Sequence, residues 1–193
     1  MVTALIKEIE IYRNDESEYP LKRIGLNFPV FKDGGEVTEL LWDKGNTVET
    51  DYLLTYSDEN RFTASQEADF LQRKTDSANN VEIIAVVDDV VAGTAGIDAL
   101  GMRDKIKHRA VFGIAITKEF WELGIGKYLM EACIECAREA GYLQLELEVV
   151  AENERAVEMY KRAGFIEYGR NPKAFRLRTG EYQELIDMRL ELK

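Results

Sequence analysis

Two glycines, Gly124 and Gly126, have the type and spacing that most directly indicate chemistry in this chain. They stand where a helical stretch begins, and the first turn of a helix leaves backbone N–H groups without acceptors. These donors bind phosphate together with the positive end of the helix dipole. The loop has neither the third glycine of a dinucleotide fingerprint nor the Gly-Lys-Ser/Thr of a P-loop. We therefore expect the pyrophosphate of another cofactor here, with close packing as the alternative reason for Gly-x-Gly.

A second set of polar and small residues follows one strand later. Asn153, Ala156 and Tyr160 are three and four residues apart, so they share one face of the helix predicted to begin at residue 153. Asn153 offers a side-chain amide to a cofactor, and Ala156 leaves room for it. Tyr160 carries a hydroxyl that can donate a proton. Taken without this context, Tyr160 would be interpreted as a core residue with its hydroxyl at the surface.

The elements that would position these residues form a βαβ unit. Residues 111–116 and 143–150 have the pattern of strands, and residues 124–140 between them have a helical apolar face. Two strands joined through a helix are expected to pair in parallel with a right-handed crossover. Because residues 111–116 are apolar at nearly every position, we expect that strand to be central and covered on both faces.

Antiparallel strands are expected on both sides of this unit. Residues 81–87 and 90–100 form a predicted hairpin with its turn at residues 88–89, and two more strands flank residues 179–180. Near the N-terminus, residues 5–12 alternate like a strand, and residues 65–74 resemble a helix capped by Ser65. The pattern predicts a mixed α/β (α+β) fold, mostly antiparallel with one parallel step, in a single domain over residues 1–193.

Composition and charge restrict the function classes. The 193 residues carry a formal net charge of −11, which argues against a nucleic-acid partner because phosphates demand clustered Lys and Arg. We find no signal peptide and no membrane span, and we expect a cytoplasmic protein. Cys133 and Cys136 have a spacing that can indicate redox or zinc chemistry, but the single histidine, His108, lies outside their predicted helix. We expect both cysteines to pack as small apolar residues, and we expect no metal.

The two motifs together resemble the GCN5-related N-acetyltransferase (GNAT) superfamily over roughly residues 81–192. The acetyl-CoA loop of that family reads Gln/Arg-x-x-Gly-x-Gly/Ala, and this chain has Trp121 in its first position. Asn153, Tyr160, Gly164 and Phe165 match the helix that follows. The resemblance implies a mixed sheet, flanked by helices, that splays between strands 111–116 and 143–150 and binds acetyl-CoA in the gap.

The resemblance also implies roles for individual residues. The loop would bind the phosphates, the strand backbone would pair with the pantetheine arm, and the following helix would complete a cofactor site made of Ile114, Ala115, Ile116, Glu122, Leu123, Gly124, Ile125, Gly126, Lys127, Asn153 and Ala156. Tyr160 would protonate the departing thiolate, and Glu148 would take the proton of the amine. For Glu148, a solvated strand face shared with Glu146 is the alternative, with a water chain as the proton path.

The expected activity is direct transfer of an acetyl group to a primary amine of a small molecule, such as an amino acid or a polyamine. A protein N-terminus or lysine is the alternative acceptor, and a non-catalytic acyl-CoA-binding module is the alternative class. A homodimer is a further expectation, since dimers are frequent in this superfamily. Six residues of the N-terminal part could contribute to the acceptor site or serve solubility and packing: Glu49, Asp51, Glu59, Trp42, Tyr52 and Tyr56.

Overall fold

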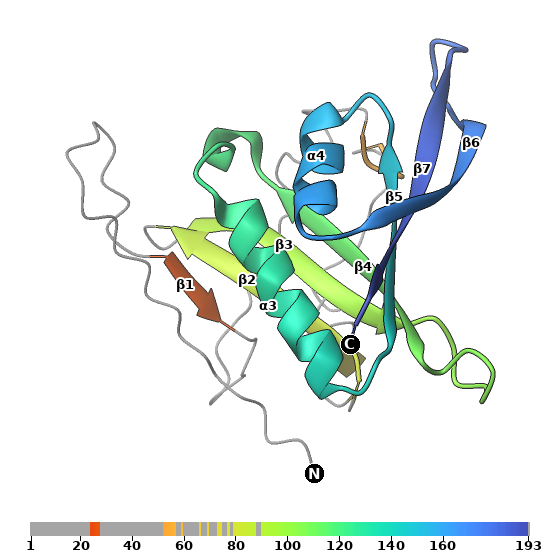
Figure 1. Ribbon diagram of the computed structural model, residues 1–193. Coiled ribbons are helices and arrows are strands. Elements are labelled where there is room, and N and C mark those ends of the chain that lie inside the picture. The colour runs from red at the N-terminus through yellow and green to blue at the C-terminus, as the bar shows by residue number, and fades with distance from the viewer. Residues whose placement is uncertain are drawn as a thin grey trace.

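A seven-stranded sheet forms the centre of the computed structural model, in the order β1-β2-β3-β4-β5-β7-β6 (Figure 1). The structure describes residues 24–27, 52–56, 59, 66, 69, 73–74, 77, 79–87 and 90–192. The strands are β1 (Ile24–Asn27), β2 (Val81–Val87), β3 (Val90–Ala99), β4 (Arg109–Ile116), β5 (Gln144–Val150), β6 (Ile166–Arg176) and β7 (Tyr182–Glu191). The helices are the 3-10 turn η1 (Lys118–Phe120), α3 (Ile125–Glu139) and α4 (Glu154–Arg162).

The mixed fold class predicted from the pattern is confirmed. All neighbouring strands pair antiparallel except β4 and β5, which are parallel and are joined through α3. β1 was not predicted, and the strand expected at residues 5–12 lies outside the described residues. Most of the helix expected at residues 65–74 also lies outside them, and its described members are helical.

The parallel pair is closed at one end and open at the other. Register between β4 and β5 runs only from Arg109↔Gln144 to Val111↔Glu146. Beyond that point β3 still pairs with β4 as far as Ile116, and β7 still pairs with β5 as far as Val150. The two inner edges therefore diverge into a wedge, bounded by residues 112–116 of β4 and residues 147–150 of β5. The predicted splay of the sheet is confirmed.

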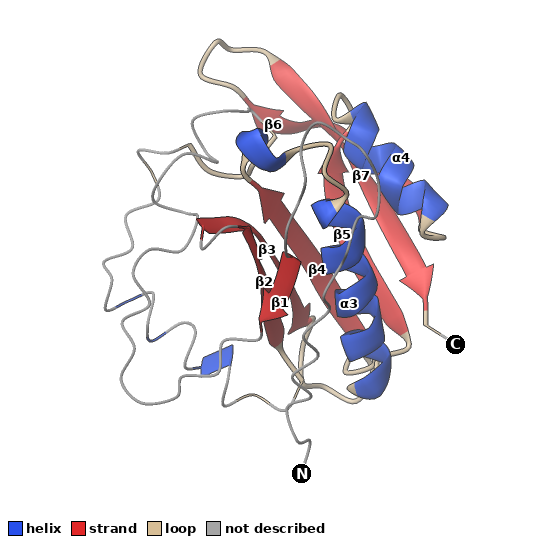
Figure 2. Ribbon diagram, turned by 90° about the vertical axis from the view of Figure 1, so that its left-hand side faces the viewer, coloured by secondary structure: helices blue, strands red, loops and turns tan. Residues whose placement is uncertain are grey.

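Helices α3 and α4 cover the same side of the sheet, which we call the helix face (Figure 2). Side chains alternate along β5, so that Leu145, Leu147 and Val149 are buried on the helix face while Glu146 and Glu148 belong to the opposite face. The fully buried Ile97 and Leu129 belong to the same core. Each such side chain contributes about 1.5–3 kcal/mol of hydrophobic stabilisation.

The two cysteines lie in α3, as expected. Cys133 is fully buried and Cys136 is half-buried, and neither forms a disulfide within the described residues. Burial raises the pKa of the Cys133 thiol well above its usual value, so this group stays protonated and packs as an apolar residue. No helix in the described part of the chain has the length and apolar character required to cross a membrane.

Candidate active site

The glycine loop before α3 presents a cluster of backbone donors. Glu122 and Gly124 both have positive φ, 66° and 81°, and Gly124 is the N-cap of α3 without any side-chain cap. The backbone hydrogen bonds of α3 begin at Lys127, whose N–H donates to the Gly124 carbonyl at 3.1 Å. Among the described residues the N–H groups of residues 122–126 have no backbone acceptor outside helical turns. The loop therefore offers the arrangement that a pyrophosphate requires.

The second glycine of the loop has a packing role. A Cβ at Gly126 would lie 3.0 Å from Cδ1 of Ile116 and 3.3 Å from the sulfur of Met159. These atoms belong to β4 and α4, so Gly126 allows the first turn of α3 to approach both elements at the mouth of the wedge. The close-packing alternative thus applies to Gly126, whereas Gly124 is needed for its left-handed backbone.

Alternate residues of β4 direct their backbone groups into the wedge. The N–H of Thr117 donates to the carbonyl of Ala92 at 3.0 Å, which fixes the odd-numbered residues of β4 as those bonded to β3. The N–H and C=O of Ile114 therefore face the wedge, whereas those of Ala115 bond to β3. Of the residues predicted to contact a pantetheine arm through their backbone, Ile114 has its groups directed into the wedge. The backbone groups of Ala115 are already bonded to β3.

Trp121 forms a hydrogen bond with another backbone group of β4 that faces the wedge. Its indole Nε1 donates to the carbonyl of Ile116 at 2.8 Å. The Arg155 guanidinium lies 5.6 Å from the centre of the same ring and 3.6 Å from the Glu122 carboxylate. These contacts connect the loop to α4 across the wedge. The sequence marked Trp121 only as a departure from the family pattern, and nothing in it singled out Arg155.

The residues predicted on α4 lie on the helix face beside the wedge. Oδ1 of Asn153 accepts from the N–H of Ala156 at 3.3 Å, so Asn153 caps the helix and keeps its NH₂ group for a ligand. Tyr160 is 6% exposed, with its ring between Phe112 and Phe165 at centroid distances of 6.2 and 5.8 Å. Burial raises the pKa of Tyr160, so the hydroxyl keeps its proton at neutral pH.

The two glutamates of β5 differ in environment. Glu146 is buried and forms a two-pronged ion pair with Arg109, with Nη2 to Oε2 at 2.7 Å, which holds the pKa of Glu146 below its usual value. Glu148 is exposed and lies beside the wedge. The alternative for Glu148 is a solvated strand face shared with Glu146. Glu146 does not fit that alternative, because it is buried and paired with Arg109. Tyr160 and Glu148 therefore approach the wedge from opposite faces of the sheet.

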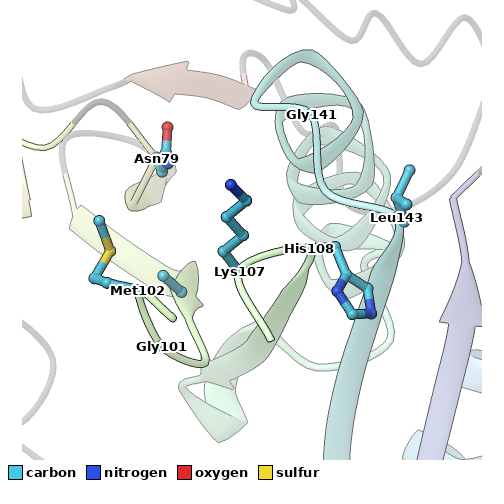
Figure 3. A pocket seen from close by; sticks show the side chains of 8 residues that line it. Asn79, Gly101, Met102, Lys107, His108, Gly141 and Leu143 are labelled. Carbon is cyan, nitrogen blue, oxygen red and sulfur yellow. The ribbon is translucent and has the colours of Figure 1, made fainter. Parts of the chain in front are cut away.

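A hollow of about 340 Å³ lies at the closed end of the β4–β5 pair, away from the wedge (Figure 3). His108 lines it, and the His108 carbonyl accepts from the N–H groups of Leu143 and Gln144 at 2.8 and 3.2 Å. The other lining residues are Asn79, Ala99, Gly101, Met102, Lys107, Gly141 and Leu143. This position removes His108 from the chemistry expected at the wedge.

The N-terminal candidates are only partly described. Glu49, Asp51 and Trp42 lie outside the described residues. Tyr56 is half-buried, with its hydroxyl accepting from the Arg178 N–H at 3.1 Å and the Arg178 guanidinium 4.1 Å from its ring centre. Glu59 is exposed and lies 3.9 Å from the same guanidinium. Tyr56 and Glu59 thus pack against the β6–β7 connection, and Tyr52 is half-buried.

The family model described as "Acetyltransferase (GNAT) family" matches residues 41–165, which is more than half of the chain. A relative from Escherichia coli (strain K12), L-amino acid N-acetyltransferase AaaT, is 32% identical over 61% of this chain and 72% of that protein. A GNAT-family acetyltransferase from Streptococcus pneumoniae superimposes with a TM-score of 0.72 at 27% identity, over 75% of this chain and 86% of that one. The yncA structure from Salmonella typhimurium, a putative acetyltransferase solved with acetyl-CoA, superimposes with a TM-score of 0.68 at 15% identity, over 76% and 82% of the two chains.

A sheet opened at its single parallel step, with a donor-rich loop at the mouth, defines an acyl-CoA-dependent transferase. The chain belongs to the GNAT family of acetyltransferases, and the acetyl donor of this family is acetyl-CoA. The predicted family, enzyme class and cosubstrate are thereby confirmed.

Proposed function

We propose that this protein transfers the acetyl group of acetyl-CoA directly to the primary amine of a small molecule, with Glu148 and Tyr160 on either side of the reacting carbonyl. The observation that carries the proposal is their placement on opposite faces of one wedge. Such a placement lets the amine approach from one face while the thiolate leaves on the other.

The chain offers three groups of contacts that fit acetyl-CoA. The N–H groups of residues 122–126 suit a pyrophosphate, and the Lys127 ammonium adds a positive charge at the same turn. Backbone groups of Ile114 in the wedge suit an extended chain of amides, because unpaired strand edges require partners. The NH₂ of Asn153 supplies one more donor.

The proposed roles of the residues follow from the bonds that change. The ammonium loses one proton, the neutral amine nitrogen bonds to the thioester carbonyl carbon, the C–S bond breaks, the nitrogen loses its second proton, and the thiolate gains one. Glu148 accepts the first proton of the ammonium, Tyr160 donates its phenolic proton to the sulfur, and the second proton of the nitrogen restores the Tyr160 hydroxyl. An N–H in the wedge, such as that of Ile114, stabilises the negative charge on the carbonyl oxygen, an effect worth about 3–4 kcal/mol per donor.

The acceptor class proposed is an amino acid, a polyamine or a similar small amine. The E. coli relative supports this class, since its name assigns it to L-amino acids. The exposed position of Glu148 supports it as well, because a carboxylate there attracts an ammonium group. A protein N-terminus or lysine side chain remains the alternative acceptor.

The test is a screen of small amines with acetyl-CoA, reading free thiol release and confirming acetylated products by mass spectrometry. We expect amine-dependent thiol release from the purified protein. Binding of acetyl-CoA without release for any amine, peptide N-terminus or lysine peptide would reject transferase activity. Release with peptides alone would assign the alternative acceptor.

A further inference from the structure

The face of the sheet opposite the helices carries several charged side chains, and most of them are paired within the chain. Glu146 pairs with Arg109, and the Arg189 Nε lies 2.9 Å from Glu191. Further along the sheet, Lys74 pairs with Glu82 and Asp98 at 3.5 and 2.6 Å.

Glu148 and Asp187 differ from these groups. Neither side chain has a hydrogen bond or an ion pair in the part of the chain that the structure describes. They are also direct neighbours, because Glu148 is in register with Asp187 across β5 and β7. Two carboxylates without a hydrogen-bond or ion-pair partner among the described residues therefore stand side by side next to the wedge.

The register of β5 and β7 places the side chains of Glu148 and Asp187 at close-packed positions. The N–H of Ala151 donates to the Glu184 carbonyl at 2.9 Å, so odd-numbered residues of β5 form the hydrogen-bonded pairs with β7. Glu148 and Asp187 are consequently a non-hydrogen-bonded pair, the type in which opposite side chains approach most closely. Like charges directly opposite each other destabilise a sheet.

At the neighbouring pair of positions on the same two strands, the facing side chains carry opposite charges. Two residues earlier in β5, Glu146 stands opposite Arg189, a pair of opposite charges. The chain therefore matches charge across β5 and β7 at one position and violates that match at the next. Positions where a fold breaks its own local rule are expected at functional sites.

Open space lies on one side of the pair, and the Asp187 side chain itself fills the space on the other side. Gly113 of β4 is exposed, and a Cβ placed on it would meet no atom within 4 Å. On the other side, the Asp187 carboxylate lies over Gly169 of β6, where a Cβ would be only 2.7 Å from Oδ2. Glu148 on β5 and Asp187 on β7 thus lie between the wedge and β6, in the β5-β7-β6 part of the sheet (Figure 1).

We propose that Glu148 and Asp187 bind an acceptor with two positive charges, an aliphatic diamine or polyamine, and that Asp187 is the residue that determines this specificity. The inference rests on the proposed function and names its substrate class. Glu148 holds the amine that reacts, and Asp187 holds the second cationic group. Within the proposed class of acceptors this favours a polyamine over the amino acids that the name of the E. coli relative gives, because an α-carboxylate beside the amine would face two carboxylates.

Three amines of matched chain length test the inference. Putrescine has both charges, butylamine lacks the second one, and ornithine adds a carboxylate to the putrescine skeleton. We expect the wild-type protein to have its highest kcat/KM with putrescine. Asp187→Asn should raise the KM for putrescine about tenfold, the loss typical of one charged hydrogen bond, with kcat and the KM for butylamine within twofold.

The stability of the variant distinguishes a binding role from a structural one. Relief of like-charge repulsion predicts that Asp187→Asn unfolds at the same or a higher temperature than wild type. Asp104→Asn, in the exposed loop before β4, removes the same net charge far from the wedge and should change neither KM. A higher kcat/KM for ornithine than for putrescine, or an unchanged putrescine KM in Asp187→Asn, would overturn the inference while leaving acetyl transfer intact. If none of the three amines is acetylated, the inference is wrong, and the wider amine screen decides the proposed function.

Discussion

Replacing Gly124 by proline tests whether the loop before α3 binds the phosphates of acetyl-CoA. Gly124 has φ 81°, whereas proline is fixed near about −65° and has no N–H. One donor is lost, and the left-handed turn that aims its neighbours is lost with it. A hydrogen bond to a charged group contributes about 1.5–3 kcal/mol, so acetyl-CoA affinity should fall about tenfold to a hundredfold.

The same helix provides a matched control at its other end. Gly141 has φ 82°, and a Cβ there would meet nothing within 4 Å. Gly141→Pro also loses a hydrogen bond to the Arg138 carbonyl at 3.0 Å, so it should destabilise the fold at least as much as Gly124→Pro. We expect titration calorimetry to show weaker acetyl-CoA binding for Gly124→Pro alone. Equal affinities in the two folded variants would refute the phosphate assignment of the loop.

Three further outcomes are expected. Tyr160→Phe keeps both ring contacts and should retain stability and acetyl-CoA affinity while kcat falls about 10²–10⁴-fold; an unchanged rate would leave Tyr160 as a packing residue. Glu148→Gln should depress kcat most below the pKa of the amine, and pH profiles that superimpose on wild type would favour a water chain. Glu146→Gln should lower the free energy of unfolding by about 1.5–3 kcal/mol at neutral pH. Because Arg109 lowers the pKa of folded Glu146, the stabilisation is present above the unfolded pKa of about 4.3 and is lost as pH falls through the lower folded pKa. Urea unfolding should therefore show the wild-type advantage shrinking in that acid range, and a pH-independent difference would contradict the ion-pair account.

The strands and helices of the C-terminal two thirds could be predicted because local patterns and long-range packing agree there. Alternation in β5 is a direct consequence of one-sided burial. The apolar run of β4 correctly predicted an inner strand, but the expected cover on both faces is wrong, because Val111 and Gly113 are exposed on the face opposite the helices. β1 escaped prediction because four residues, Ile24–Asn27, are too few to show a period.

The site residues that belong to a family sequence motif could be predicted. The contacts that depend on how strands pair with one another could not. Gly124, Asn153 and Tyr160 belong to such motifs, and the structure brings them to one wedge. Nothing in the sequence indicated that Ala115 turns its backbone to β3, that Trp121 bonds to Ile116, or that Asp187 stands opposite Glu148. These relations depend on the pairing of strands distant in the sequence, which only the folded sheet establishes.

Initial-rate kinetics with both substrates varied test the central claim most directly, namely that the acetyl group passes straight from the thioester to an amine across the wedge. With the wedge accepting donor and acceptor from opposite faces, and with Cys133 buried away from both, we predict double-reciprocal lines that intersect, as a ternary complex requires. Parallel lines, together with an acetylated protein trapped in the absence of amine, would contradict the account.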